Sequence, residues 1–421
     1  MDKLVIEGGP RLEGTIEISG AKNAALPIMA ASLLTDEPCV IKNVPALRDI
    51  DTMIKILREL EIRVERKKGS VSIKGPAGSV TATYGLVSTM RASVCVLGPL
   101  LAKKKVARVS FPGGCVIGPR PIDLHLKGLE ALGAQIKIKS GYILARAKKL
   151  KAANIYLGGH FGSSVLATAN TLMAATLAEG TSVIENAACE PEVVDLANFL
   201  IAMGAKIEGH STPTIRVRGV KKLHGANYEI IPDRVETGTY MIAAAATGGD
   251  IFLKNARPQH LMAVIDKMRE SGTDITERPS GIRVRRSRGK RIKSVTVTTL
   301  PYPGFPTDMQ AQIMSLLCLA DGISVITEKI YPERFIHVSE LSRMGAHILL
   351  EGPNAIIKGV GGLSGADVMA SDLRASAGLV LAGLVARGKT KIHRIYHLDR
   401  GYEHLDRKLN AVGARVWREK D

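Results

Sequence analysis

Aromatic side chains are scarce in this chain of 421 residues, where phenylalanine, tyrosine and tryptophan together make up 4%. Proteins that bind single-stranded nucleic acid stack the bases on aromatic side chains set among basic residues. The most basic stretch of the chain, residues 283–293, contains no aromatic residue. The sequence therefore argues against a nucleic-acid-binding protein, the alternative from a different functional class.

Long apolar runs are missing as well. Charged residues or glycines interrupt every apolar stretch well before the roughly 18 residues that a membrane-spanning helix needs. Residues 1–7 do not combine a basic segment with an apolar one, as a secretion signal does. We therefore expect a cytoplasmic protein without a membrane partner.

Cysteine is rare and widely spaced. The five cysteines include no pair with the spacing of a zinc site or a redox motif, and their odd number does not indicate a disulfide framework. His393 and His397 lie four residues apart, but the alternating polarity around them predicts a strand, which does not bring them onto one helical face. The sequence predicts no metal site.

Positive charge is abundant. Lysine and arginine number 58 against 40 acidic residues, which gives a net charge of +18. Such a surplus indicates nucleic acid, an acidic membrane surface, or anionic small molecules held in a cleft. Two basic stretches, residues 103–105 and 283–293, are expected to be solvated surface.

A weak repeat runs through the chain: an amphipathic helix, a turn centred on a small residue, and an alternating strand. Glycine after a helix permits the left-handed conformation that turns the chain into the next strand. The steps between successive turns are 68 to 73 residues, which predicts six α/β units. The turns are centred on residues 61, 133, 204, 272, 345 and 413.

The six units group into two halves, because corresponding motifs such as Gly133 and Gly345 lie 212 residues apart. We expect an α/β (α+β) fold of two similar domains with three units each. One domain would comprise residues 22–229, and the other residues 1–21 plus 230–421. A solenoid is the alternative, but its units are shorter, at about 20 to 50 residues, and do not group in halves.

The glycine- and proline-rich residues 111–121 surround Cys115. Such a loop covers its side chains poorly, so we expect an accessible thiol, and the neighbouring Arg120 favours the thiolate. Cys115 is therefore a candidate nucleophile or proton shuttle. The other four cysteines are expected to be structural or incidental.

Several charged residues lie at expected helix starts. Arg91 and Arg374 each open a helix, where a guanidinium can face a carboxylate or a phosphate. Asp308 follows a proline-rich segment and either caps a helix or serves as a general base. Lys22 follows a segment that resembles only the end of a phosphate loop, so its position alone favours a solvent-exposed lysine at a helix start.

Together these motifs resemble the UDP-N-acetylglucosamine 1-carboxyvinyltransferases, a family of enolpyruvyl transferases. The resemblance implies two domains, each with three βαβαββ-type units around a pseudo-threefold axis, an arrangement described as an inside-out α/β barrel. It implies neither a cofactor nor a metal. The resemblance extends from end to end and rests on residues 19–27, 90–93, 112–115, 120–125, 181–190, 304–308, 333–335, 371–376 and 399–403.

The resemblance implies transfer of the enolpyruvyl group of phosphoenolpyruvate to the 3'-hydroxyl of UDP-N-acetylglucosamine, with release of phosphate. In that family the reaction is the first committed step of peptidoglycan synthesis for the bacterial cell wall. The nearest alternative is the related family of 3-phosphoshikimate 1-carboxyvinyltransferases, which shares the fold. Those enzymes use no loop cysteine, so Cys115 argues against them.

The family's functional residues carry over to matching positions. Cys115 matches the cysteine that protonates phosphoenolpyruvate and is the thiol expected to react with the epoxide fosfomycin, while Asp308 matches the base that faces the 3'-hydroxyl. Lys22 and Arg400 also match catalytic positions. Contacts to phosphoenolpyruvate are implied for Lys22, Asn23, Arg120 and Arg400. Contacts to UDP-N-acetylglucosamine are implied for Arg91, Arg120, Pro121, Ile122, Asp123, Leu124, Ser163, Ser164, Val165, Asp308 and Ile330. Other charged residues of the cleft are Arg334, Asp372 and Arg374. The segment 160–168 departs from the pattern that many members carry before this helix.

Overall fold

The chain folds into two compact domains in a computed structural model. Domain 1 comprises residues 20–113 and 121–231, and domain 2 comprises residues 2–19 and 232–420. The chain thus passes from domain 2 into domain 1 after residue 19 and returns after residue 231. The structure describes residues 2–113, 121–159, 162–287 and 289–420.

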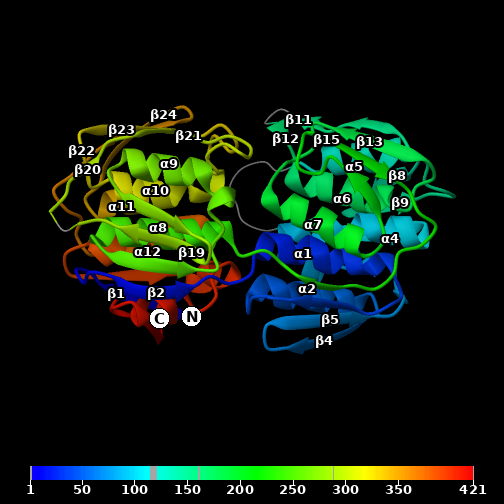
Figure 1. Cartoon of the computed structure of the whole chain (residues 1–421), viewed down its shortest axis with the longest axis horizontal. Helices are drawn as coiled ribbons and strands as arrows, with labels where there is room; N and C mark the ends of the chain where they lie inside the picture. Colours follow the sequence, from blue (N-terminus) through cyan, green and yellow to red (C-terminus); the bar gives the residue numbers. More distant parts are fainter. Residues whose placement is uncertain (1, 114–120, 160–161, 288, 421) are drawn as a thin grey trace. The chain divides into compact units, whose positions relative to one another are not determined.

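Domain 1 contains three four-stranded sheets with one shared topology (Figure 1). In each sheet the first edge strand is parallel to its neighbour, and the two remaining pairings are antiparallel. In sheet order, the strands are β16 (Asn227–Glu229), β3 (Cys39–Lys42), β5 (Ser70–Lys74) and β4 (Arg63–Lys67); β6 (Thr81–Ala82), β7 (Val106–Ser110), β9 (Tyr142–Arg146) and β8 (Gln135–Lys139); and β10 (Asn154–Tyr156), β13 (Thr181–Glu185), β15 (Thr214–Arg218) and β14 (Lys206–Glu208).

Domain 2 repeats this topology three more times. In sheet order, its strands are β2 (Glu13–Glu17), β17 (Asp250–Lys254), β19 (Gly281–Arg285) and β18 (Asp274–Arg278); β21 (Thr296–Thr298), β23 (Ile323–Thr327), β25 (Asn354–Lys358) and β24 (His347–Glu351); and β26 (Asp367–Met369), β27 (Lys389–His393), β1 (Asp2–Glu7) and β28 (Val416–Lys420). Six copies of one sheet confirm the six units expected from the repeat.

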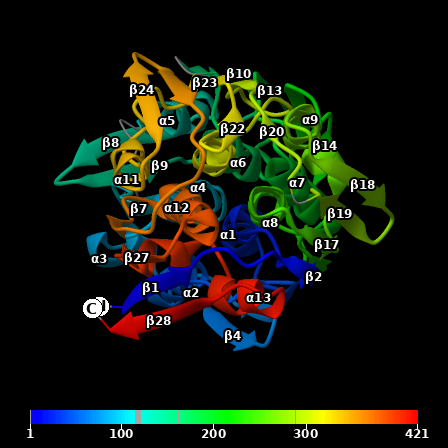
Figure 2. The same ribbon diagram turned by 90° about the vertical axis from the view of Figure 1, so that its left-hand side faces the viewer.

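The first two strands of the chain belong to different sheets of domain 2. Strand β1 lies between β27 and β28, and Figure 2 shows it, in dark blue, alongside the red β28. Strand β2 pairs in parallel with β17. Domain 2 therefore needs strands from both sides of domain 1 in the sequence to complete two of its sheets.

Each domain buries a group of helices in its interior, with the sheets around them. In domain 2, helices α8, α10 and α12 pack against one another, and in domain 1 helices α1 and α4 pack against α6 (Figure 1). Their sequences are rich in alanine, leucine and glycine, and most of their residues are buried. This placement agrees with the expected inside-out arrangement, and the described strands form separate sheets rather than a closed barrel. The buried helices are α1 (Lys22–Ala31), α4 (Leu97–Lys104), α6 (Val165–Ala175), α8 (Arg234–Thr247), α10 (Gln310–Leu317) and α12 (Leu373–Val385).

A second helix in each unit precedes the antiparallel strand pair, except that α13 precedes only β28, whose partner β1 opens the chain. These helices are α2 (Arg48–Glu59), α5 (Asp123–Ala131), α7 (Pro191–Ala202), α9 (Met262–Glu270), α11 (Val338–Arg343) and α13 (Leu405–Ala411). The remaining helical elements are short, namely η1 (Ser32–Leu34), α3 (Tyr84–Val87), η2 (Arg91–Val96), η3 (Pro258–His260), η4 (Thr307–Met309) and η5 (Ile395–Arg400). Two two-stranded pairings complete the inventory, β11 (Gly158–Gly159) with β12 (Gly162–Ser163) and β20 (Ile292–Lys293) with β22 (Ala320–Asp321).

Glycines allow the interior helices to approach closely. A Cβ atom at Gly98 would lie 2.4 Å from the carbonyl oxygen of Asn170 on α6, and one at Gly378 would lie 2.8 Å from that of Ala311 on α10. Both separations are shorter than any tolerable contact, so larger residues would force these helices apart.

Candidate active site

Lys22 is the first residue of α1 and is buried, with 7% of its surface exposed. Its Nζ lies 3.2 Å from Oδ2 of Asp49, which is 4% exposed and sits in the first turn of α2. The expectation of a solvent-exposed lysine is therefore wrong. A cation held inside the protein by a buried carboxylate is typical of a functional site, because ordinary surface lysines remain in water.

Arg91 opens η2, and its Nη2 donates a hydrogen bond to the carbonyl oxygen of Pro121, 3.0 Å away. This contact joins the expected nucleotide contacts 121–124 to a basic side chain. Pro121 and Asp123 are exposed and Leu124 is half-buried, whereas the side chain of Ile122 is buried at 6%. We infer that Ile122 contributes to packing.

His125, the residue after this segment, is buried and contacts a neighbouring helix. Its Nδ1 lies 2.9 Å from Nδ2 of Asn170 on α6, which also donates to the carbonyl oxygen of Val94. Burial, together with the charge of Arg91, lowers the pKa of His125 to about 3. The imidazole is therefore neutral at physiological pH and acts as a structural partner.

Ser163 ends the β11–β12 pairing, and Ser164 caps α6, whose first residue is Val165. The Ser164 hydroxyl accepts a hydrogen bond from the backbone nitrogen of Ala167, 3.4 Å away. All three residues are half-buried. Half-exposed hydroxyls beside an eleven-residue helix with a positive N-terminal end suit a phosphate-bearing ligand.

Cys115 and Arg120 lie outside the described residues. Of the other cysteines, Cys39, Cys95 and Cys318 are buried and Cys189 is half-buried. Burial raises the pKa of all four thiols, to about 12 for Cys95 and Cys318. None of these four therefore has the lowered pKa of a reactive cysteine, as expected.

Asp308 lies in η4, directly before α10, and its carboxylate binds two buried arginines. Oδ1 accepts from Nη1 of Arg334 at 2.9 Å, and Oδ2 accepts from Nε of Arg374 at 3.1 Å. Of the two roles considered for Asp308, the structure thus favours a charged group in a site over a helix cap.

The two arginines stay charged although they are buried. Burial is the largest single effect and lowers the pKa of each guanidinium, but the carboxylate of Asp308 and other neighbouring groups together outweigh it, so the pKa of both Arg334 and Arg374 is raised. Asp372 adds to the effect on Arg334 and caps α12 by accepting from the backbone nitrogens of Arg374 and Ala375. Domain 2 therefore brings Asp308, Arg334, Asp372 and Arg374 together, four of the residues expected for the site.

Tyr402 and Gln312 support this cluster and were missed by the sequence reasoning. The Gln312 side chain donates to the carbonyl oxygen of Asp308 at 2.8 Å and lies 3.2 Å from the Tyr402 hydroxyl. The guanidinium of Arg374 lies 5.5 Å from the centre of the Tyr402 ring. Tyr402 lies within the segment 399–403 that carries the family resemblance, but no role was assigned to it, and Gln312 belongs to none of those segments. Only the fold places the two residues beside Asp308.

Glu328 was also missed. It is fully buried, and its carboxylate accepts hydrogen bonds from the hydroxyls of Thr299 and Thr307 and from the backbone nitrogens of Ile330 and Tyr331. Glu328 therefore fixes the loop of Ile330 against the turn that carries Asp308.

Arg400 is half-buried at the end of the short helix η5. Three residues later, Glu403 accepts a hydrogen bond from the Ser19 hydroxyl at 2.6 Å. Lys408 Nζ donates to the same hydroxyl and to the fully buried Glu236, each at 2.7 Å. The Ser19 backbone nitrogen donates to Glu236 as well, at 2.7 Å, so this network holds the point where the chain leaves domain 2.

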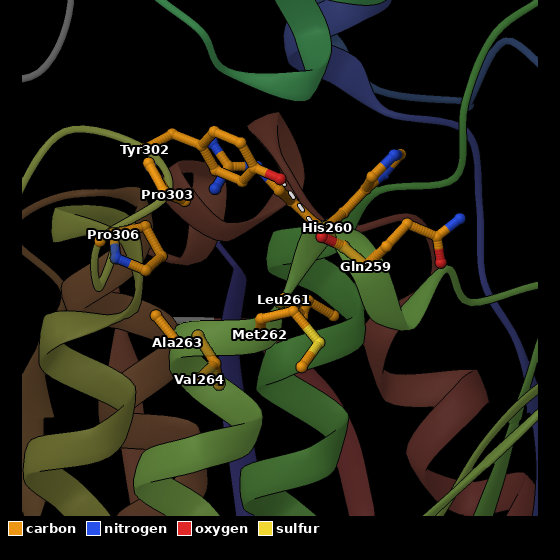
Figure 3. Close-up of a pocket in the computed structure, with 11 residues that line it drawn as sticks. Gln259, His260, Leu261, Met262, Ala263, Val264, Tyr302, Pro303 and Pro306 are labelled. Carbon is orange, nitrogen blue, oxygen red and sulfur yellow. Dashed lines mark hydrogen bonds between the residues drawn. The ribbon is translucent and has the colours of Figure 1, made fainter. Parts of the chain in front are cut away.

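A pocket lies beside the turn that leads to Asp308 in domain 2 (Figure 3). Tyr302, Pro303 and Pro306 line one side of it, and residues 259–264 line the other. The Tyr302 hydroxyl donates to the carbonyl oxygen of Gln259 at 3.2 Å, drawn as a dashed line, and its ring lies 5.6 Å from the guanidinium of Arg234.

Within the described ranges, no group of three or more histidine, cysteine or carboxylate side chains has the arrangement of a metal site. The same ranges contain no helix that is both long and apolar enough to cross a membrane.

Known proteins are similar to this chain over all or nearly all of its length. The family model described as EPSP synthase (3-phosphoshikimate 1-carboxyvinyltransferase) matches residues 6–409. The UDP-N-acetylglucosamine 1-carboxyvinyltransferase of Nitratidesulfovibrio vulgaris is 56% identical over 421 residues, which cover all of both chains.

Two solved structures have the same fold. The enolpyruvyl transferase NikO of Streptomyces tendae superposes with a TM-score of 0.88 at 23% identity, covering 99% of this chain and 98% of its own. EPSP synthase of Acinetobacter baumannii gives a TM-score of 0.76 at 19% identity and covers both chains completely. The six repeated sheets agree with the fold of these structures, and the 56% identity over the full length shows the family. The chain belongs to the enolpyruvyl transferases and, among them, to the UDP-N-acetylglucosamine 1-carboxyvinyltransferase family.

Proposed function

We propose that this protein transfers the enolpyruvyl group of phosphoenolpyruvate to the 3'-hydroxyl of UDP-N-acetylglucosamine, as the first committed step of peptidoglycan synthesis. C3 of phosphoenolpyruvate takes up a proton, and the 3'-oxygen forms a bond to C2. The resulting tetrahedral intermediate then loses phosphate from C2 and a proton from C3, which restores the vinyl group. Both substrates are small anions of the bacterial cytoplasm, where we place the reaction.

In this proposal one residue donates a proton and another accepts one. The Cys115 thiol donates the proton to C3, and Asp308 accepts the proton of the 3'-hydroxyl as the new bond forms. A base must be ionised before it can act, and the guanidinium groups of Arg334 and Arg374 stabilise the negative charge of Asp308. The pairing of the part-exposed Asp308 with two buried arginines is the single observation that carries the proposal.

The proposal assigns binding of phosphoenolpyruvate to Lys22, Asn23, Arg120 and Arg400. Protonation at C3 develops positive charge beside a carboxylate and a phosphate, and fixed cations must hold both anions in place. Arginine offers a bidentate contact and lysine a point charge. The buried Lys22–Asp49 pair suits such a role, because Asp49 holds the ammonium group in one position before substrate arrives.

UDP-N-acetylglucosamine is assigned to the segment 121–124 with Arg91 and Arg120, to Ser163, Ser164 and Val165, and to Asp308 and Ile330. The exposed Pro121 and half-exposed Leu124 offer an apolar surface to the uracil ring. The start of α6 and its serine hydroxyls suit the diphosphate.

The decisive measurement is phosphate release from phosphoenolpyruvate with each candidate acceptor. We expect turnover with UDP-N-acetylglucosamine and none with shikimate 3-phosphate. The reverse result would sink the proposal and favour the 3-phosphoshikimate 1-carboxyvinyltransferase alternative.

The role of Cys115 is tested by substitution and by labelling. Cys115→Asp should retain activity because a carboxylic acid also gives up a proton, while Cys115→Ser should lose it because a hydroxyl is a far weaker acid. Fosfomycin should alkylate Cys115 alone, since burial raises the thiol pKa of Cys39, Cys95, Cys189 and Cys318. Inactivation with the label on any of those four, found by peptide mass mapping, would contradict the assignment.

A further inference from the structure

The second sheet of domain 1, β6-β7-β9-β8, presents an unusual surface to solvent. Strand alternation turns Ala107, Val109, Ile143 and Ala145 into the core, where all four are buried. The opposite side carries the four cations that we call the basic face: Arg108, Lys137, Lys139 and Arg146, all exposed.

Register brings these cations together across the strands. Arg108 and Lys137 flank Leu144 in one row of the sheet, and in the neighbouring rows Arg146 pairs with Gln135 and Lys139 with Tyr142. Adjacent strands lie about 4.8 Å apart, so the four charges occupy one small area.

No carboxylate neutralises the basic face. The four strands of this sheet contain no acidic residue, whereas each of the other five four-stranded sheets contains at least one. Some cations of other sheets have acidic partners, as Arg283 has Asp250 at 2.8 Å and Arg63 has Glu65 at 2.6 Å. The members of the basic face form no ion pair with any described part of the chain. Clustered cations without counter-charges repel one another, which an anionic partner would relieve.

The aromatic residues at this face distinguish between anionic partners. The Arg108 guanidinium covers the Tyr142 ring at 4.0 Å, so that ring offers no stacking platform for a nucleic-acid base. Tyr84 is 67% exposed, and its backbone nitrogen donates to the Tyr142 hydroxyl at 3.4 Å. An exposed tyrosine beside lysines and arginines is typical of surfaces that meet lipid headgroups.

We propose that the basic face binds the surface of a bilayer containing anionic phospholipid. The contact is peripheral, rests on charge, and uses the outer side of one sheet. Each lysine or arginine close to such a surface contributes roughly fivefold in affinity, and the attraction falls off within a Debye length. The proposal gives part of the basic surplus a partner and revises the sequence-based expectation of a protein without a membrane partner.

The test is co-sedimentation of the full-length protein with vesicles at low and at high salt. Vesicles of phosphatidylcholine mixed equally with phosphatidylglycerol should bind the protein at low salt, and vesicles of phosphatidylcholine alone should not. The double variant Lys137→Glu/Lys139→Glu should bind at least about twentyfold more weakly. The matched control Lys42→Glu/Lys74→Glu changes the net charge equally on exposed residues of the first sheet and should stay close to wild type.

Turnover should remain unchanged in both double variants, which shows that they are folded. Absence of binding to the anionic vesicles overturns the proposal, as does an equal loss in both variants, because net charge alone would then explain the attraction. Binding of a single-stranded oligonucleotide that depends on Lys137 and Lys139, with no vesicle binding, would also overturn it in favour of nucleic acid.

Discussion

At the scale of single residues, Asp308 combines two demands that conflict in most proteins. A general base must be ionised and must reach its substrate, whereas charged groups are costly to bury. The two arginines bound to it are themselves buried, so the carboxylate satisfies them while keeping part of its own surface exposed. Stability and chemistry therefore depend on the same side chain.

We expect Asp308→Asn to lower kcat by about 10²- to 10⁴-fold, because an amide of the same shape cannot accept the proton. The variant should also unfold more easily, since Arg334 and Arg374 lose a buried counter-charge. Phosphate release and urea unfolding measure the two effects separately. Asp321→Asn is the matched control, because Asp321 also binds an arginine, Arg291, but on the exposed surface. A variant with undiminished kcat would exclude Asp308 as the base.

Residue identity can be found from sequence more readily than residue environment. Lys22, Asp308, Arg334 and Arg374 lie in short motifs that mark them, but the motifs do not reveal that Lys22 is buried. Its partner Asp49 lies 27 residues away on another helix, and Glu328 lies beside Thr299 and Thr307 only in the folded chain. Such partners have no spacing rule and follow from tertiary packing alone.

At the scale of elements, the turn after each unit's second helix was predictable because its left-handed backbone conformation favours glycine. Residues 133, 204, 272, 345 and 413 are glycines with φ between 91° and 98°. The corresponding turn at residue 61 has a glutamate in place of the glycine and keeps the left-handed conformation, at φ 61°. The fold thus preserves the turn where the preferred residue is lost. The short helix η5 was hard to predict, because six residues are too few to establish a helical period, although the buried Ile395 and Leu398 lie three residues apart.

The burial of His125, which joins α5 to α6 through Asn170, should make stability pH-dependent. The folded pKa of about 3 lies below the usual 6.5, so below about pH 6.5 protons bind preferentially to the unfolded chain and stability falls as pH decreases. Between about pH 7 and about pH 5, wild type should lose about 2 kcal/mol more than His125→Gln, whose amide retains a hydrogen-bond acceptor. Urea unfolding at both pH values measures the difference. Equal losses would mean that His125 is not the responsible group.

At the scale of the whole molecule, the two segments that join the domains are bonded to each other. In domain 2 the backbone nitrogen of Asp233 donates to the carbonyl oxygen of Ser19, and in domain 1 that of Ala21 donates to Ile231, each at 2.8 Å. The Glu236–Lys408 ion pair forms hydrogen bonds with the backbone nitrogen and the hydroxyl of Ser19. Hydrogen bonds therefore pair the two connecting segments at both ends of the connection.

Lys408→Met should destabilise the protein by about 3–5 kcal/mol, because it leaves Glu236 buried without a cation. Burial already raises the pKa of Glu236 although Lys408 opposes the shift, and removing Lys408 raises it further. The folded variant must then hold a proton that the unfolded chain releases, so the destabilisation should grow as pH rises. Urea unfolding of both proteins at about pH 5 and about pH 8 checks the trend.

Two further variants separate this effect from the general loss of a lysine. Lys408→Arg keeps the charge and should recover much of the stability. Lys267→Met removes an exposed partner of Glu270 on α9 and should cost less than about 1 kcal/mol. A penalty for Lys408→Met that is small or independent of pH would contradict the buried pairing.

The distribution of strands along the chain also sets an order of assembly during synthesis. Domain 1 contains only strands from residues 39–229, and every sheet in it can close once that stretch has left the ribosome. Strands β1 and β2 emerge earlier but must wait, β2 for β17 and β1 for β27 and β28, more than 380 residues later. During that wait β1 is an unpaired strand of apolar Leu4, Val5 and Ile6, open to pairing with another nascent chain until the last sheet closes.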